Sequence, residues 1–208
     1  MNILFHCCCA PCVSSCINSL RNEGLTNESF GIDLFWYNPN IHPYTEYRSR
    51  LKTLAGYAAK ENIKLKMIDE YGLRTFLKEV PDDLSARCKK CYRIRLEETA
   101  AAAAREGYAS FSTSLLVSPY QDHDAIKRIG EETAAKYGIN FFYRDFRPFF
   151  REGQAQARAG GMYMQKYCGC IFSEEERYSQ KGTYDDPRPK APSRSEFLGI
   201  NPLGMNKP

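Results

Sequence analysis

The feature that most constrains the fold is an alternation of short apolar runs with amphipathic helical segments. Apolar runs of about four to eight residues, separated by longer helices, are typical of parallel strands joined by helical crossovers. The sequence therefore predicts an α/β fold, a Rossmann-like parallel sheet with helices on both faces, as a single domain over 1–178. Such sheets bind ligands beyond the carboxyl ends of their strands. The expected strands are 2–7, 30–37, 63–68, 109–116 and 139–145, and the expected helices are 10–20, 44–62, 84–106, 121–137 and 154–166.

The composition changes near residue 179, where prolines punctuate a segment with few periodic apolar residues. We expect 179–208 to be a Pro-rich C-terminal tail. No run approaches the roughly 18 apolar residues of a membrane span, and the N-terminus lacks the basic region of a signal peptide. We therefore expect a cytoplasmic monomer with no membrane partner. The formal net charge of +4 permits a nucleic-acid partner without demanding one.

The nine cysteines are clustered rather than scattered. An odd number of cysteines in a chain expected to be cytoplasmic favours metal-binding or redox-active thiols over structural disulfides. The first cluster directly follows the strand expected at 2–7, so the sequence predicts a cysteine-rich metal site at the carboxyl ends of the strands. The clusters are Cys7, Cys8, Cys9, Cys12 and Cys16; Cys88 and Cys91; and Cys168 and Cys170.

Four of these thiols form two pairs that could act together. Cys8 and Cys9 end a strand, and Cys88 and Cys91 form a Cys-x-x-Cys motif near the start of a helix. Four thiolates can hold zinc or an iron–sulfur cluster, and adjacent cysteines are an awkward zinc chelate. Nearby positive charge would favour thiolates and could meet phosphates, although it equally suits a solvated helix face. The basic residues concerned are Arg87, Lys89, Lys90, Arg93 and Arg95.

Two further spacings suggest thiol redox chemistry. Cys9-Ala-Pro-Cys12 has the form of a dithiol motif at a helix N-terminus, where the helix dipole lowers the pKa of a thiol. A disulfide between Cys168 and Cys170 would span one residue and be readily reduced, which favours a redox relay; two further metal ligands are the alternative. We expect Cys7 and Cys16 to be core residues.

Two loops after predicted strands combine turn residues with polar side chains, and loops of this kind often bind ligands. They cover 38–48 and 112–123. No phosphate-binding Walker A or Gly-x-Gly-x-x-Gly motif accompanies them. The candidate ligand contacts or proton donors are His42, Tyr44, Glu46, Arg48 and His123.

Five segments, in order, resemble the cobalamin-independent epoxyqueuosine reductases, the QueH family. The resemblance runs from about residue 3 to 177, and it implies the HUP-like form of the Rossmann-like sheet. It also implies reductive removal of the epoxide oxygen from epoxyqueuosine at the tRNA wobble position, the last step of queuosine synthesis. The segments are 6–12 (HCCCAPC), 37–48, 87–96, 111–123 and 165–173 (QKYCGCIFS).

The resemblance also implies a cofactor and its ligands. The matching positions are Cys8, Cys9, Cys88 and Cys91 for a [4Fe-4S] cluster, and Cys168 with Cys170 for a redox-active pair. Some members are similar in holding an additional mononuclear iron through an aspartate just after Ala-Pro. This chain has Cys12 there, so either a thiolate replaces the carboxylate or the additional iron is absent. Cys7 with Cys8 remains a second choice for the adjacent pair.

The chemistry is consistent with this resemblance. Converting an epoxide to an alkene and water requires two electrons, two protons and an oxophilic acid; a cluster delivers electrons singly, and an open iron could polarise the C–O bond. The principal hypothesis is an iron–sulfur oxidoreductase acting on tRNA, bound through Lys89, Lys90 and Arg93, with an unidentified electron donor. The alternatives are a thiol–disulfide oxidoreductase using Cys9 and Cys12, and a zinc-stabilised RNA-binding protein.

Overall fold

A five-stranded parallel sheet forms the centre of the fold. The computed structural model describes residues 2–25 and 31–179, so nearly all of the predicted tail lies outside the described residues. Every strand pair is parallel, and the predicted α/β fold is confirmed. The strands, in spatial order, are β3 (Leu65–Met67), β2 (Gly31–Trp36), β1 (Asn2–His6), β4 (Ser110–Thr113) and β5 (Asn140–Phe141).

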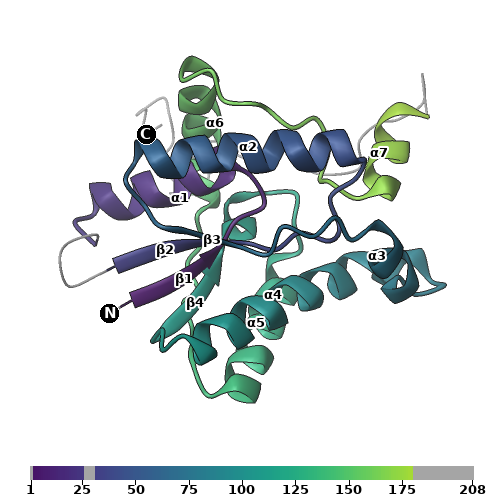
Figure 1. The fold of residues 1–208 in the computed structure, drawn as a ribbon, viewed down its shortest axis with the longest axis horizontal. Coiled ribbons are helices and arrows are strands. Elements are labelled where there is room, and N and C mark those ends of the chain that lie inside the picture. The colour runs from purple at the N-terminus through teal and green to yellow at the C-terminus, as the bar shows by residue number, and fades with distance from the viewer. Residues whose placement is uncertain (1, 26–30, 180–208) are drawn as a thin grey trace, which may run out of the picture.

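Helices cover both faces of the sheet, as Figure 1 shows: α1, α2 and α6 lie on one side, and α4 and α5 on the other. The central strands β1 and β4 are short and almost entirely buried, which suits a sheet covered on both sides. The α-helices are α1 (Ala10–Asn22), α2 (Tyr44–Lys60), α3 (Leu73–Glu79), α4 (Arg87–Arg105), α5 (His123–Tyr137), α6 (Phe150–Ala159) and α7 (Ile171–Tyr178).

The chain changes direction at the middle of the sheet. From β1 it continues to β2 and β3 at one edge, then returns through α4 to β4 on the other side of β1. The crevice between the carboxyl ends of β1 and β4 is thus the topological switch point, where sheets of this kind bind ligands. In Figure 1 these ends point to the right, toward α3 and α7.

The expected last helix, 154–166, is wrong at both ends. A 3-10 turn at Arg147–Phe149 leads directly into α6 at Phe150, and α6 stops before Gly160 and Gly161. Gly161 has a φ of +67°, a left-handed conformation that glycine adopts without a Cβ penalty. Residues 160–170 therefore form a loop. Helices α3 and α7 were not among the expected elements.

A polar network joins the carboxyl ends of the central strands. Buried His6, at the end of β1, donates from Nε2 to Oδ1 of Asn38 (3.3 Å), and its Nδ1 accepts from the hydroxyl of Thr113 on β4 (2.9 Å). Asn38 also donates to the carbonyl of Cys7 (2.9 Å). With these donor and acceptor roles the imidazole is neutral, as its pKa also indicates. Burial lowers the pKa of His6 to about 4, and the positive charge of Arg95 acts in the same direction.

We expect acid to destabilise the protein through His6. The unfolded histidine has a pKa near 6.5, so the unfolded chain binds the proton first as the pH falls toward 4. Stability present above pH 6.5 is then lost, by up to about 3 kcal/mol for this shift. Urea unfolding of chelator-treated wild type and His6→Gln between pH 7 and 4.5 measures the effect. The variant should lose less stability over this range, and equal losses would contradict the assignment.

Candidate metal centre and adjoining pocket

Three buried thiols meet where β1 ends and α1 begins. The sulfurs of Cys8, Cys9 and Cys12 all lie within 4.8 Å of one another, and those of Cys8 and Cys9 are 4.0 Å apart. Cys9 caps α1, because its Sγ accepts from the backbone N–H of Cys12 (3.2 Å), and Pro11 occupies the first turn, where its missing N–H costs nothing. Soft, buried sulfur ligands at this spacing could bind a metal ion.

The three thiols differ in proton affinity. The pKa of Cys8 lies well below its ordinary value because the thiols of Cys12 and Cys9 and the hydroxyl of Ser114 donate to its thiolate. The pKa of Cys9 is raised mainly by burial, and that of Cys12 mainly by its hydrogen bond to Cys8. The group thus favours one thiolate stabilised by its neighbours, and binding a metal through all three sulfurs would release protons.

The Cys-x-x-Cys thiols lie on the first turns of α4. Cys91 packs with Cys170 and Phe76 in a small apolar cluster, whereas Cys88 is exposed. Burial raises the pKa of both α4 thiols, and the charges of Cys168 and Cys170 raise it further. Among the described residues, only the group of Cys8, Cys9 and Cys12 brings three potential metal ligands within 4.8 Å. Cys12, expected as the ligand of an additional iron or as a redox thiol with Cys9, belongs to that group, and the α4 thiols lie outside it.

Cys7 and Cys16 are buried beside the centre but outside that group. The Cys7 thiol donates to the carbonyl of Phe5 (3.1 Å), and burial raises the pKa of both thiols. Both positions agree with the expected core role.

The Cys168-Gly-Cys170 segment ends the loop that follows α6. Both cysteines are free thiols in the structure, and Cys170 caps α7 by accepting from the backbone N–H of Ser173 (3.4 Å). Gly169 has a φ of +142°, and a Cβ there would lie 3.3 Å from Nη1 of Arg50. Glycine therefore permits both the backbone conformation and the close approach of this arginine.

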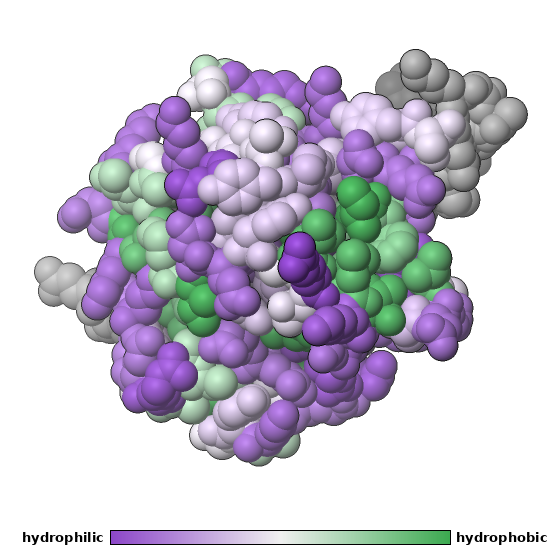
Figure 2. All heavy atoms as spheres, turned by 45° about the vertical axis from the view of Figure 1, so that its right-hand side comes forward, coloured by the Kyte–Doolittle hydropathy of each residue, from purple (hydrophilic) through white to green (hydrophobic). Residues whose placement is uncertain are grey.

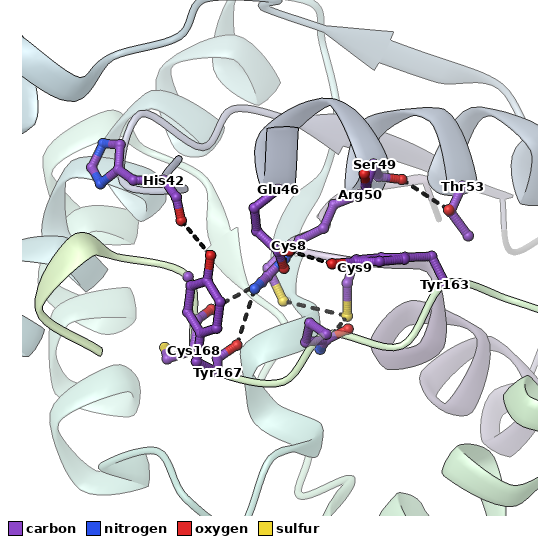
Figure 3. Close-up of polar contacts among 12 residues, drawn as sticks. Cys8, Cys9, His42, Glu46, Ser49, Arg50, Thr53, Tyr163, Tyr167 and Cys168 are labelled. Carbon is purple, nitrogen blue, oxygen red and sulfur yellow. Dashed lines mark hydrogen bonds and ion pairs between the residues drawn. The ribbon is translucent and has the colours of Figure 1, made fainter. Parts of the chain in front are cut away.

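Arg50 on α2 fixes this segment from the other side, as Figure 3 shows. Its Nη1 donates to the carbonyl of Cys168 (2.9 Å) and its Nη2 to that of Tyr167 (3.0 Å), while Nε donates to Glu46 (2.7 Å). The hydroxyl of Tyr163 donates to the other oxygen of Glu46. The buried Glu46–Arg50 pair therefore uses its donors to hold the redox-candidate loop beside Cys8 and Cys9.

His42 supports the same loop. Its backbone N–H donates to the carbonyl of Gly169 (2.7 Å), and its own carbonyl accepts from the hydroxyl of Tyr167 (2.7 Å). Its Nδ1 accepts from the N–H of Ile171 (3.3 Å), and its Nε2 donates to the carbonyl of Pro39 (3.0 Å). Burial lowers the pKa of His42 to about 4, so the ring is neutral at physiological pH. In Figure 3 the ring points away from the thiols.

The other expected ligand contacts also have protein partners. Tyr44 packs against Tyr47, Arg48 pairs with Asp69 (2.8 Å), and Nε2 of His123 donates to the carbonyl of Ser118 (3.0 Å). None of His42, Tyr44, Glu46, Arg48 and His123 lines the pocket beside the thiols. Their role in substrate binding stays a prediction.

A pocket of about 160 Å³ opens onto the thiols. Cys8, Cys12 and Cys168 line it, so thiols from the first and third cysteine clusters face one cavity. The Nε2 of Gln165 donates to Cys9 (3.0 Å) and Cys12 (3.4 Å), and that of Gln121 donates to Cys168 (3.7 Å). The remaining lining residues are Ser114, Leu115, Ser118, Tyr120, Phe150, Gln154, Lys166 and Tyr167.

Sequence reasoning missed most of this lining. The segments that carry the family resemblance include four of these lining residues, so the resemblance could have pointed to them: Tyr120, Gln121, Gln165 and Lys166. Phe150 lies outside them; its ring meets that of Tyr120 edge to face, with centroids 5.8 Å apart. The two rings form an apolar part of the pocket lining.

The basic residues expected to contact tRNA lie at the start of α4. Lys89, Lys90 and Arg93 line a second groove of about 360 Å³, together with Arg128 of α5. Lys90 pairs with Glu79 (2.6 Å) and Arg93 with Glu132 (2.6 Å), so carboxylates partly neutralise this groove. Figure 2 shows the molecule with the side of α3 and α7 turned forward. This face is mostly hydrophilic, with an apolar area on the side of these two helices.

The fold and the site together define a Rossmann-like α/β protein with a buried thiol centre at its switch point. The family model described as "Epoxyqueuosine reductase QueH" matches residues 3–176. The chain belongs to this family, and the expected class of enzyme, an oxidoreductase, is confirmed.

Relatives named "Epoxyqueuosine reductase QueH" match along most of the chain. The Dehalococcoides mccartyi protein is 35% identical over 178 residues, which are 86% of this chain and 95% of that protein. The Thermotoga maritima protein is 36% identical over 84% of this chain and 91% of its own length. The Acinetobacter baylyi protein is 30% identical over 82% and 79%, respectively. None of the helices in residues 2–25 and 31–179 combines the length and apolar character that crossing a membrane requires.

Proposed function

We propose that this chain reduces epoxyqueuosine in the anticodon loop of tRNA to queuosine. The observation that carries the proposal is that Cys8, Cys12 and Cys168 line one pocket, so the candidate metal centre and the candidate dithiol open onto the same cavity. Family membership over residues 3–176 supports the substrate. Free thiols and a tRNA substrate also favour a cytoplasmic location, and we propose that the enzyme acts as a monomer.

The alternative activities have less support. A thiol–disulfide oxidoreductase using Cys9 and Cys12 would need an accessible pair, whereas Cys9 is only 1% exposed and does not line the pocket. A zinc-stabilised RNA-binding protein would not require the thiol of Cys168 in the same pocket as Cys8 and Cys12.

The proposed cofactor is a [4Fe-4S] cluster held by Cys8, Cys9, Cys88 and Cys91, with Cys12 as a ligand of an additional iron. The donor set fits such a group, because the thiols are soft and mostly buried and Cys8 favours the thiolate form. When bound, the cofactor would supply single electrons and a Lewis-acidic iron.

The residues of the chain would supply the rest of the chemistry. The reaction consumes two electrons and two protons and yields one alkene and one water. Oxidation of Cys168 and Cys170 from two thiols to one disulfide releases the required two electrons and two protons. Lys166 also lines the pocket, where its side chain can donate a hydrogen bond to the epoxide oxygen. The rings of Tyr120 and Phe150 provide an apolar surface against which a planar base can pack.

The direct test combines metal analysis with a defined substrate. Protein reconstituted without oxygen should hold about five irons and four sulfides per chain, the cluster and the additional iron together, and absorb broadly in the visible. With a reductant, it should convert an anticodon stem-loop carrying epoxyqueuosine into a product that mass spectrometry finds lighter by one oxygen atom. A metal-loaded protein that leaves this substrate unchanged would contradict the proposal. Zinc alone would favour the RNA-binding alternative, and no metal the thiol–disulfide oxidoreductase.

For tRNA binding we expect a steep dependence on salt, because Lys89, Lys90 and Arg93 would displace counterions from phosphates. A Lys89→Ala, Lys90→Ala double variant should reduce the slope of log affinity against log salt by about 2, one for each lost phosphate contact. Lys60→Ala, at the C-terminal end of α2, is the control, because α2 runs back from the carboxyl edge of the sheet. Equal binding of the free nucleoside and the stem-loop, or binding indifferent to salt, would argue against this placement.

A further inference from the structure

Two buried arginines lie near the thiols, and they differ in their partners. Arg50 is 1% exposed and donates to the carboxylate of Glu46 and to two backbone carbonyls. Arg95, on α4, is 2% exposed and donates from Nε to the carbonyl of Cys91 (3.1 Å). Within residues 2–25 and 31–179, its buried Nη2 has no hydrogen-bond partner and no ion pair includes it. Arg95 is therefore a buried cation without a carboxylate counter-ion.

A buried guanidinium of this kind is costly, because desolvation is not offset by an opposite charge or a complete set of hydrogen bonds. A partner that supplies negative charge and acceptor atoms would remove the penalty. The phosphates of a nucleic acid do not suit this role, since Arg95 is almost fully buried and lines neither the thiol pocket nor the basic groove. The missing partner must therefore lie inside the protein.

The surroundings of Arg95 identify that partner as sulfur. Arg95 follows Cys91 by four residues, so both lie on one face of α4, and its guanidinium lies 6.0 Å from the ring centre of Tyr92. The sulfurs of Cys91, Cys168 and Cys8 lie close enough to Arg95 that their negative charge, once the thiols are deprotonated, would raise its pKa. These three cysteines come from all three cysteine clusters. The positive charge of Arg95 also lowers the pKa of His6, but this histidine is neutral and supplies no negative charge to pair with the arginine.

We propose that Arg95 is the counter-ion of the thiolate-bound iron–sulfur centre and that its free Nη2 donates a hydrogen bond to a sulfur of that centre. The inference rests on the metal centre of the proposed function. Accepting an electron makes the centre more negative, so a fixed cation beside it stabilises the reduced state. Arg95 is then a positioning residue that raises the reduction potential of the centre.

The test measures the reduction potential rather than activity alone. In Arg95→Gln the equilibrium between reduced and oxidised centre should shift at least tenfold toward the oxidised form, which is about 59 mV for a one-electron couple. Arg95→Lys keeps the charge but lacks the planar donor group, and its potential should lie between those of Arg95→Gln and wild type. Arg105→Gln, at the exposed end of the same helix, is the matched control and should keep the wild-type potential.

Metal-free protein gives an independent readout. Removing an unpaired buried cation should leave the thermal midpoint of metal-free Arg95→Gln equal to or above that of metal-free wild type, while lowering its retention of iron under chelator. An arginine with a merely structural role would lower the metal-free midpoint and leave the potential unchanged. This second readout decides the matter if the glutamine variant cannot be loaded with metal.

The outcomes separate this inference from the proposed function. If wild type cannot be loaded with iron and sulfide, the metal centre itself fails, whatever Arg95 does. If wild type loads normally and both Arg95 variants keep its potential, only the role of Arg95 is overturned. A metal-free Arg95→Gln that is clearly less stable than metal-free wild type would also overturn it.

Discussion

Replacing Cys8 with serine is expected to remove the metal centre and reduce turnover to background. Cys8 is the sulfur that favours the thiolate form, and it faces the pocket, whereas a serine hydroxyl stays protonated and is a hard ligand. Losing a direct ligand should exceed the roughly 10- to 100-fold loss of metal affinity caused by altering outer partners of ligands. Iron and sulfide per chain, the visible absorption band and stem-loop turnover measure the result.

Companion variants test the proposed ligand set. Cys91→Ser should also lose the cluster and activity, whereas Cys12→Ser should keep four irons and lose only the additional one. Cys16→Ala is the matched control: this buried thiol lies one helical turn after Cys12 but outside the group of close sulfurs, so the variant should keep both metal and activity. An active Cys8→Ser protein with its full iron content would exclude Cys8 as a ligand.

Replacing Cys170 with serine is expected to leave the absorption spectrum of the centre unchanged while abolishing turnover driven by a dithiol reductant. Without Cys170, Cys168 cannot complete the disulfide that releases two electrons and two protons, although it still lines the pocket. A strong chemical reductant that reduces the centre directly should restore part of the activity, and this provides the internal control.

Two outcomes would contradict that relay. If Cys170→Ser destroys the centre, the two sulfurs are ligands, which is the alternative that the sequence left open. If the variant turns over normally with every reductant, the pair has no part in the reaction. Cys168→Ser distinguishes the two thiols further, because only Cys168 faces the pocket.

The sheet could be predicted from the sequence because its strands are apolar runs that need burial on both faces. Helices α3 and α7 escaped prediction because both are short and depend on tertiary contacts. Phe76 buries α3 against Cys91 and Cys170, and α7 begins only where Cys170 caps it. In the sequence, Gly160-Gly161 marks the end of α6, but the amphipathic pattern of the residues that follow favoured a helix continuing to residue 166.

In the candidate site, too, some features could be predicted from the sequence and others could not. Spacing alone singled out the cysteine clusters, because metal ligands and dithiols follow short local patterns. The functions of Arg50 and Gln165 depend on contacts with residues more than 100 positions away in the chain, such as Arg50 with Cys168, and local patterns carry no trace of them. The local sequence of loop residues such as His42 predicts substrate contacts, which stays a prediction, but it does not reveal that their polar atoms hold a second loop.

The pairing of β1 also bears on how the protein matures. Successive residues of an extended segment face opposite sides, so a slip of one position would place Cys7 where Cys8 should be. Ladders to β2 and β4 on both sides of β1, and the bond from the Cys7 N–H to Phe35 (2.8 Å), hold the correct alignment. A nascent chain offers five cysteines within 7–16 and cannot choose among them until residues 110–113 have been synthesised and paired. With the iron–sulfur centre proposed above, metal delivery is expected only after sheet assembly.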